Sequence, residues 1–558
     1  MVLEPTHVPQ VVKRERRTDL VICALLVLAA GVVFSKDLTV GGVRWPDEST
    51  HVMDGVLILD WLRAGPAAWK NPVAFAIQQY GHYPNLGIVG VYPPGFAAVE
   101  AAFLAVLGVS VVTGRIAVVC FGIAATIGCY VLARRWNTRW TAICTTALLI
   151  GMPMTITWTR QTMLEMPTLA VLVWLLCFAQ RYADEPTWRR LLPVAALAVA
   201  APLFKQYAVF MIPVLGVAAL HLWRRRRIPL RHLVVTATFV GIVLGGYAFF
   251  SVLERGQGPL LTRAFNASTP VAQWLSWPEL SFYGRSLLSD QGAGPVIAAL
   301  AALGLALSLR RRDGRWMLLL LWFVAAYGIV AVMQHKEPRF LFFAYLPVAF
   351  WAGLAAATLL ERLPARRFRA TAGVAAVAVV LACGYRTPID YRPDFAPLAT
   401  AYAAQLRGGL VLVEADRDTS FVLAARGSAG PRGCTVIRGS KTLYACASDV
   451  NWDFRSYVSS PEDVAALLDR FAFDLLFVER GNVRGLREVT LLQQEVGDLD
   501  RYELLGSHAL RVPPPHEARP VVIDVYRPRH VGPRLAREID IPMPLVGRTV
   551  RVTIGGPQ

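Results

Sequence analysis

The sequence predicts a polytopic α-helical membrane protein that ends in an α/β domain. Of the 558 residues, 55% are hydrophobic and only 17% are charged, and the mean hydropathy is +0.44. A soluble globular protein has about 25% charged residues. Long apolar segments recur up to residue 384, whereas short Val-rich segments follow it. We therefore expect a transmembrane domain over residues 1–384 and a soluble extracytoplasmic α/β domain over residues 385–558.

Arginine clusters between the apolar segments predict how the chain crosses the membrane. The formal net charge is +18, and much of it lies in these short clusters. Arg-rich loops mark the cytoplasmic side, so the charge does not indicate a nucleic-acid partner, and alternation from a cytoplasmic N-terminus gives about eleven transmembrane helices. We expect the membrane to be a bacterial-type inner (plasma) membrane. The expected spans are residues 20–34, 111–133, 140–158, 166–180, 191–204, 207–223, 234–252, 295–309, 316–333, 341–360 and 370–383.

Residues 36–110 are expected to form a first external loop with juxtamembrane helices. A short apolar stretch follows Tyr92-Pro93-Pro94-Gly95 and ends near Gly108. It is shorter than the roughly 20 residues that cross a bilayer, so we interpret it as an interfacial helix. Counting it as a span would place the later Arg cluster at residues 134–139 outside, against the charge rule.

The tail has the pattern of an α/β domain. Residues 409–414, 474–479 and 521–526 are apolar, Val-rich and bounded by turn or polar residues, which predicts strands. Residues 461–473 have apolar positions at helical spacing. Cys434 and Cys446 are the two cysteines of the tail, and the sequence leaves open whether they form a disulfide or stay free. No Cys-x-x-Cys pair is present, so a cysteine zinc site is not expected.

Two adjacent carboxylates, Asp47 and Glu48, follow the first apolar segment. Placing a carboxylate in lipid costs free energy, so two carboxylates at the end of a transmembrane segment suggest a functional role. We interpret Asp47 as a general base, which would take a proton from an incoming hydroxyl group and contribute typically about 10²–10⁴-fold to the rate. Glu48 and His51 are candidates for acceptor or metal contacts. The alternative is that these acids only solvate a loop or cap the helix that follows.

Basic side chains at the other predicted outer loops could bind a departing phosphate. Lys205 lies in a tight turn between two apolar spans, and Lys336 and Arg339 lie outside against the orientation rule. Fixed cations stabilise a phosphate that leaves as an anion, whereas a snorkelling lysine at the membrane edge is the alternative for Lys205. The predicted donor or phosphate-binding residues are Lys205, Lys336, Arg339, Arg160, Glu165 and Tyr92, and the candidate acceptor or metal-site residues are Glu48, His51 and His335.

Five short motifs, in order, resemble those of the GT-C membrane glycosyltransferases, a group that includes the protein O-mannosyltransferases and the lipid A aminoarabinose transferases. The similarity covers roughly residues 20–360 and is specific to the superfamily rather than to one substrate. The motifs are Trp45-Pro46-Asp47-Glu48, Tyr92-Pro93-Pro94-Gly95 with Gly108 and Arg115, Arg160 through Glu165-Met166-Pro167, Lys205 with Pro213, and residues 335–347.

The resemblance implies an inverting transferase that moves a sugar from a polyprenyl-phosphate donor to a cell-envelope acceptor. It implies that Asp47 is the base and that Glu165 lies near the donor, although this chain has Glu165 where Asp is usual and Phe340 where Tyr is common. Metal use varies in the superfamily, and Asp47, Glu48, His51 and Glu165 are of types that ligate a hard divalent cation. A glycolipid transporter or flippase, and a non-catalytic protein of envelope polysaccharide assembly, are the alternatives.

Overall fold

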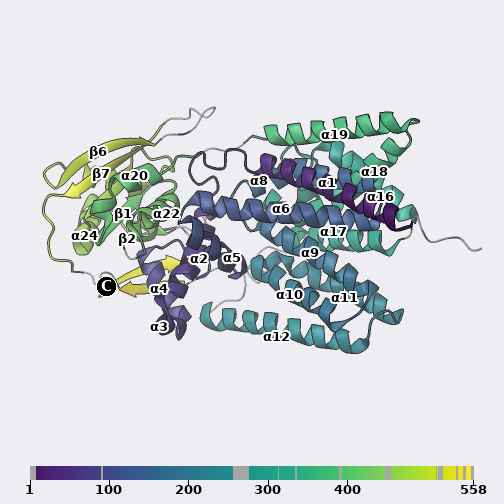
Figure 1. Cartoon of the computed structure of the whole chain (residues 1–558). Coiled ribbons are helices and arrows are strands. Elements are labelled where there is room, and N and C mark those ends of the chain that lie inside the picture. Colours follow the sequence, from purple (N-terminus) through teal and green to yellow (C-terminus); the bar gives the residue numbers. More distant parts are fainter. Residues whose placement is uncertain are drawn as a thin grey trace, which may run out of the picture. The chain divides into compact units, whose positions relative to one another are not determined.

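The protein is described from a computed structural model, which divides into two compact units (Figure 1). The helical unit contains Met1–Leu38, Ile116–Ala248 and Leu260–Ile389, and the sheet unit contains Thr39–Arg115, Phe249–Pro259 and Asp390–Gln558. The structure describes residues 8–89, 92–255, 276–311, 313–333, 336–388, 392–431, 433–445, 454–510, 512, 520–535, 538–543 and 548–553.

The helical unit is built mainly from long apolar helices, two of which, α6 and α12, are shared between the units. Its elements are α1 (Val8–Phe34), α6 (Val111–Trp136), α7 (Arg139–Gly151), α8 (Pro153–Thr159), α9 (Glu165–Asp184), α10 (Trp188–Phe204), the 3₁₀ helix η1 (Gln206–Phe210), α11 (Met211–Arg224), α12 (Leu230–Arg255), α15 (Trp277–Leu288), α16 (Pro295–Arg311), α17 (Gly314–Ala331), the 3₁₀ helix η2 (Pro338–Ala344), α18 (Tyr345–Glu361) and α19 (Arg366–Arg386).

Every segment predicted to span the membrane is helical over most of its length. Among the described residues, eight helices are long and apolar enough to cross a bilayer, and α7 with α8, bent by 59°, makes a ninth. Helices α10 and α16 have 17 residues each, which is the lower limit for a span. The protein is therefore a multi-pass helical membrane protein, while the number of spans and their orientation stay predictions. The apolar stretch after Tyr92 forms α5 (Gly95–Leu107), a helix of 13 residues.

Two glycines allow α18 to pack closely against its neighbours α7 and α16. A Cβ at Gly353 would overlap the backbone and hydroxyl group of Thr145 in α7. A Cβ at Gly304 of α16 would overlap the carbonyl group of Trp351 in α18. Small residues at helix crossings let backbones approach in membranes, where apolar burial alone gives little driving force. These positions therefore fix how closely the three helices pack.

We expect Gly353→Ala to reduce strongly the yield of folded protein, because the backbone of α7 would have to move. Gly328→Ala is the matched control, since Gly328 lies in α17 and no described atom lies within 4 Å of the place that its Cβ would take. Replacing a helix glycine by alanine at such a position is favourable by about 0.5–1 kcal/mol. Monodisperse yield and thermal unfolding in lipid nanodiscs measure both variants. Equal behaviour of the two would contradict the packing argument.

The sheet unit combines the first-loop helices with the tail of the chain. Its elements are α2 (Pro46–Ala64), α3 (Pro66–Trp69), α4 (Pro72–His82), α5, α20 (Ala396–Ala401), α21 (Ala403–Leu406), β1 (Gly409–Glu414), α22 (Asp418–Ala429), β2 (Cys434–Arg438), α23 (Gly439–Thr442), β3 (Tyr444–Ala445), β4 (Arg455–Ser456), α24 (Pro461–Phe471), β5 (Leu475–Glu479), α25 (Arg487–Val496), β6 (Tyr502–Leu510), β7 (Val521–Pro528), β8 (Glu538–Met543) and β9 (Arg548–Thr553).

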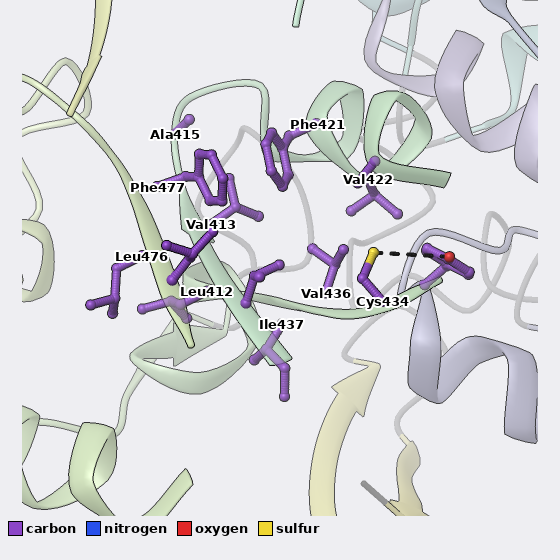
Figure 2. Packing of buried hydrophobic residues seen from close by; sticks show 14 of the residues in the cluster. Leu412, Val413, Ala415, Phe421, Val422, Cys434, Val436, Ile437, Leu476 and Phe477 are labelled. Carbon is purple, nitrogen blue, oxygen red and sulfur yellow. Dashed lines mark hydrogen bonds between the residues drawn. The ribbon is translucent and has the colours of Figure 1, made fainter. Parts of the chain in front are cut away.

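The main sheet has the strand order β2-β1-β5-β7-β6. Strand β1 pairs parallel with β2 and β5, and β7 pairs antiparallel with β5 and β6. All residues of β1 and β5 are buried, which is why these strands are continuous apolar runs. Figure 2 shows Phe421 of α22 packed on Phe477 of β5, with ring centroids 4.5 Å apart. The three predicted strands and the predicted helix at residues 461–473 are present as β1, β5, β7 and α24.

The first loop packs on the tail within this unit. Arg426 of α22 contacts both carboxylate oxygens of Asp60 in α2, at 2.7 and 2.8 Å. The Tyr83 hydroxyl donates to the Gly430 carbonyl at 2.8 Å. The Cys434 thiol is free and buried beside Tyr83, at 3.9 Å from its hydroxyl, whereas Cys446 lies outside the described residues. The predicted division between residues 384 and 385 stays a prediction, but the folded loop and tail form one body.

Candidate active site

The acidic pair begins α2, and helix geometry separates its two side chains. Pro46 is the first residue of the helix and Trp45 before it is extended, so Asp47 and Glu48 both lie in the first turn. Residues four and seven positions apart share a helix face, whereas adjacent residues do not. Asp47, His51 and Asp54 therefore share one face, and Glu48 lies to its side. Asp47 is half-buried and Glu48 is fully buried.

Glu48 forms an ion pair with Arg115 of α6, and both side chains are fully buried. Arg115 Nε donates to Glu48 Oε1 at 2.8 Å, and the backbone N–H of Arg44 donates to Oε2 at 2.7 Å. Arg115 Nη2 also donates to the Gly42 carbonyl at 2.7 Å. Glu48 thus ties the start of α2 to the loop before it. The sequence signal for this pair was the charge at position 115 in an otherwise apolar helix, which calls for a partner.

We expect Arg115→Met to destabilise the protein by about 3–5 kcal/mol, because the Glu48 carboxylate would stay buried without its counter-charge. The double variant Arg115→Met, Glu48→Met should recover most of the loss, since an apolar pair of similar size often replaces a buried ion pair. Thermal unfolding in nanodiscs measures the difference. Arg551→Met, which removes the exposed partner of Asp540, is the control and should leave stability unchanged. An Arg115→Met variant as stable as wild type would contradict the stabilising role of the Glu48–Arg115 ion pair.

The face of α2 that carries Asp47 meets the loop that carries Tyr92. The His51 ring lies 4.5 Å from the Tyr92 ring, and Asp54 Oδ1 accepts the Ile88 backbone N–H at 2.9 Å. A Cβ at Gly87 would overlap the Tyr92 ring, so only glycine allows this close approach. Asp54 was not singled out from the sequence, although its spacing from Asp47 and His51 is the available signal. Together these contacts hold the part of α2 that follows Asp47 against the loop that carries Tyr92.

In the helical unit, Lys205 and Glu165 form an ion pair. Lys205 directly follows α10 and Glu165 begins α9, and the Lys205 Nζ to Glu165 Oε1 distance is 2.5 Å. The Glu165 side chain is fully buried, and the Lys205 side chain is 12% exposed. Glu165 Oε2 is buried without a hydrogen-bond partner in the described part of the chain. The predicted membrane-edge lysine and the second acidic motif therefore meet in one place.

A row of aromatic rings links Lys205 to a second cation, Arg339, and a third cation, Lys336, belongs to the same unit. The Tyr207 ring, 5.7 Å from Lys205 Nζ, meets the Phe340 ring edge-on at 5.1 Å. Arg339 stacks at 5.6 Å on Phe340 and on Trp158 and pairs with Glu337 at 2.5 Å. Lys336 Nζ lies 3.4 Å from Glu279 and 2.6 Å from the Ala331 carbonyl. Each of the three cations thus has a carboxylate beside it.

Arg160 donates to backbone carbonyl groups. Its Nε and Nη2 contact the Val33 carbonyl at 2.9 and 2.6 Å, and Nη1 contacts the Thr387 carbonyl at 3.1 Å. Arg160 is only 2% exposed. It therefore joins the end of α1 to the chain after α19. Its predicted contact with donor phosphate stays a prediction.

The structure brings the predicted residues together in two groups, one in each unit. Asp47, Glu48, His51 and Tyr92 belong to the sheet unit, and Arg160, Glu165, Lys205, Lys336 and Arg339 belong to the helical unit. His335 lies outside the described residues. No group of three His, Cys, Asp or Glu side chains able to hold a metal occurs within the described ranges, and Glu48 is engaged by Arg115.

Parts of the chain are similar in sequence or in fold to known proteins. The family model for dolichyl-phosphate-mannose-protein mannosyltransferases matches residues 91–245. The structure of ArnT from Cupriavidus metallidurans in the apo state is 15% identical, with 90% of this chain and 97% of that chain covered and a TM-score of 0.57. ArnT bound to undecaprenyl phosphate gives the same identity and coverage with a TM-score of 0.55. No curated protein sequence matches.

A third similar structure is the Archaeoglobus fulgidus oligosaccharyltransferase in complex with Zn and sulfate. It is 11% identical, with 82% of this chain and 68% of that chain covered and a TM-score of 0.51. At these identities the likeness shows a shared fold. The chain therefore has the fold of these membrane proteins, and its residues 91–245 are similar to the dolichyl-phosphate-mannose-protein mannosyltransferase family.

Proposed function

We propose that the protein is an inverting glycosyltransferase that uses a polyprenyl-phosphate sugar as donor and a hydroxyl group of a cell-envelope glycan, lipid or protein as acceptor. The reaction would take place at the outer face of the inner membrane. The observation that carries this proposal is the Lys205–Glu165 ion pair at the end of α10, with Arg339 close by across the Tyr207 and Phe340 rings. A donor of this class has a sugar that must be activated and a phosphate that must be stabilised as it leaves.

The cations of the helical unit suit the leaving group. When the bond between the sugar C1 and the phosphate oxygen breaks, the bonding electrons stay with the phosphate, which gains negative charge. Lys205 offers a point charge and Arg339 a planar guanidinium group that can contact two phosphate oxygens. Because these side chains are largely buried, their interaction with the developing charge is stronger than it would be in water. No general acid is needed at this oxygen.

Glu165 has two tasks in this proposal. It holds Lys205 in position before the donor arrives, and its unpartnered Oε2 offers an acceptor for a hydroxyl group of the donor sugar. A buried carboxylate oxygen without a partner is unfavourable by about 1–3 kcal/mol, so a donor that completes its hydrogen bonds gains binding energy there. This is consistent with the place near the donor that the resemblance implies.

Asp47 is the base in this proposal. The acceptor hydroxyl oxygen attacks C1 from the face opposite the phosphate, its proton passes to Asp47, and the configuration at C1 inverts. Glu48 does not act as a base in this proposal, because its carboxylate forms an ion pair with Arg115. His51 and Tyr92 position the surroundings of Asp47 through their ring contact. The lipid chain of the donor would remain in the bilayer.

The proposal is tested with the full-length protein in vesicles that contain polyprenyl-phosphate sugars. A transferase releases free polyprenyl phosphate in an acceptor-dependent reaction. A glycolipid carrier would move the donor across the vesicle without breaking the bond at C1, and that outcome would overturn the proposal. Mass spectrometry of envelope glycans from cells that lack the protein identifies the missing sugar and its acceptor, and unchanged glycans would also count against transfer.

A further inference from the structure

The turn between α11 and α12 carries a dense cluster of arginines. All five are exposed, and they are Arg224, Arg225, Arg226, Arg227 and Arg231. The segments Gln206–Arg224 and Leu230–Phe250 on either side are both long and apolar enough to cross a bilayer, so the short turn between them lies at a membrane surface. Lys205 directly precedes the first segment, which places the arginines at the other membrane surface, away from the proposed transfer site.

An open hollow of about 310 Å³ lies beside this turn, within the helical unit. Arg226 and Arg227 line it together with four apolar residues, which are Pro186, Trp223, Ile228 and Pro229. The start of α12 is fixed nearby, because His232 Nδ1 lies 2.9 Å from the Tyr182 hydroxyl and the His232 ring packs at 4.1 Å on Trp188. Sites for small molecules have volumes of about 300–1,000 Å³, so the hollow is large enough for a small ligand.

The five arginines of the turn lack acidic partners. The acids of the neighbouring turn are already matched, since Asp184 pairs with Arg135 and Glu185 pairs with Arg190. Within the described ranges, no ion pair joins a carboxylate to any of the five arginines. An excess of positive charge therefore remains beside the hollow, which attracts an anion and excludes a cationic ligand.

Arg226 occupies a backbone position that favours glycine. The Arg227 N–H donates to the Leu222 carbonyl at 2.9 Å, and the Arg226 N–H donates to the Trp223 carbonyl at 2.7 Å. These two bonds form a Schellman motif, whose left-handed residue is usually glycine. Here that residue is Arg226, with a φ of 54°. A side chain is unfavourable in this conformation, so its presence indicates a role for the guanidinium group.

The helices beside the hollow present apolar side chains to their surroundings. None of the apolar window of the α12 span is buried, and only 28% of that of the α11 span is buried. Next to the arginines, Leu220 is 40% exposed and Leu230 is 52% exposed. Such side chains face acyl chains when the helices lie in a bilayer. A lipid that carries a phosphate therefore uses both the arginines and the apolar surface, whereas a free phosphate ion uses only the arginines.

We propose that this hollow binds the phosphodiester headgroup of an anionic phospholipid from the surrounding bilayer. The Arg226 guanidinium group can contact two phosphate oxygens, and Arg227 adds a second positive charge. Trp223 is of the residue type that lies at the level of lipid headgroups. Basic pockets beside transmembrane helices bind anionic headgroups in this way. The site uses none of the residues that the transfer reaction uses.

The test uses the full-length protein, purified and delipidated in detergent and then titrated with phosphatidylglycerol or phosphatidylcholine. Native mass spectrometry should show one phosphatidylglycerol bound in preference to phosphatidylcholine. The double variant Arg226→Gly, Arg227→Gln should weaken that binding by about 30-fold, the effect of removing two arginines near a lipid surface. Because glycine suits the left-handed position, this variant should fold as well as wild type, which thermal unfolding in phosphatidylcholine nanodiscs measures.

The controls separate this site from general charge attraction and from the transfer site. Arg310→Gln, Arg311→Gln removes the same charge from two exposed arginines at the end of α16 and should keep wild-type affinity. Lys205→Met, Glu165→Gln should keep it too, so failure of the transfer proposal would not decide this one. Equal binding of the two lipids, an equal loss in the Arg310 and Arg311 variant, or displacement of phosphatidylglycerol by inorganic phosphate would each overturn the proposal.

Discussion

Replacing Asp47 with asparagine is expected to slow sugar transfer by about 10²–10⁴-fold while donor binding stays intact, because a positioned base contributes that much to a reaction that must remove a proton. Asparagine has nearly the same shape and cannot accept a proton from the acceptor. The first turn of α2 should stay folded, because the Glu48–Arg115 ion pair still holds it. The rate of the chemical step would decrease, whereas the affinity for the donor would stay unchanged.

Two measurements separate these effects. Mass spectrometry of envelope glycans from deletion cells that carry the variant reports transfer, and native mass spectrometry of the purified variant reports co-purifying polyprenyl phosphate. Asp290→Asn is the matched control, because Asp290 is an exposed acid of the helical unit with no predicted role. Full transfer by Asp47→Asn would remove Asp47 from the mechanism, and loss of donor binding would reassign it to the donor.

Replacing Lys205 with methionine is expected to weaken both donor binding and transfer, the latter by about 10²–10³-fold, the range found when one stabilising group for a developing charge is removed. It also leaves the fully buried Glu165 without its partner. Breaking a buried ion pair by removing one side costs about 3–5 kcal/mol of stability. A loss of activity in this variant alone could therefore come from unfolding.

The double variant Lys205→Met, Glu165→Gln distinguishes the two causes. It removes the unpaired buried charge, so we expect stability to return to within about 1 kcal/mol of wild type while transfer stays lost. Thermal unfolding in nanodiscs and affinity for undecaprenyl phosphate are measured on the same samples. Lys36→Met is the control, because Lys36 is another lysine of the helical unit, contacts Tyr385 and has no predicted role. A stable and fully active double variant would exclude Lys205 from phosphate binding.

Much of the fold follows from local patterns in the sequence. The apolar segments predicted as spans are helical because their composition favours a membrane, where backbone groups must be paired within the segment. The segment after Tyr92 was predicted as a short interfacial helix from its length and from the charge rule, and α5 has 13 residues. Strands β1, β5 and β7 were found because buried strands are short Val-rich runs bounded by turn residues.

The roles of individual charged residues could not be found in this way. In the sequence, Asp47 and Glu48 are simply two adjacent acids. Only the packing of α6 shows that Arg115 forms an ion pair with Glu48. Arg160 sits in a motif that suggests phosphate binding, yet its guanidinium group contacts the carbonyl groups of Val33 and Thr387. An ion-pair or hydrogen-bond partner that is distant in the sequence produces no periodic pattern from which the contact could be predicted.

By itself, the sequence determined the element types, the membrane character and the resemblance to the GT-C enzymes, because these depend on composition, periodicity and short motifs within one segment. The tertiary structure alone decided that the first loop and the tail fold as one body, through contacts such as Asp60 with Arg426, and that Lys205 meets Glu165. The physical reason is that ion pairs and close packing depend on which surfaces meet, and residues hundreds of positions apart meet only when the whole chain folds.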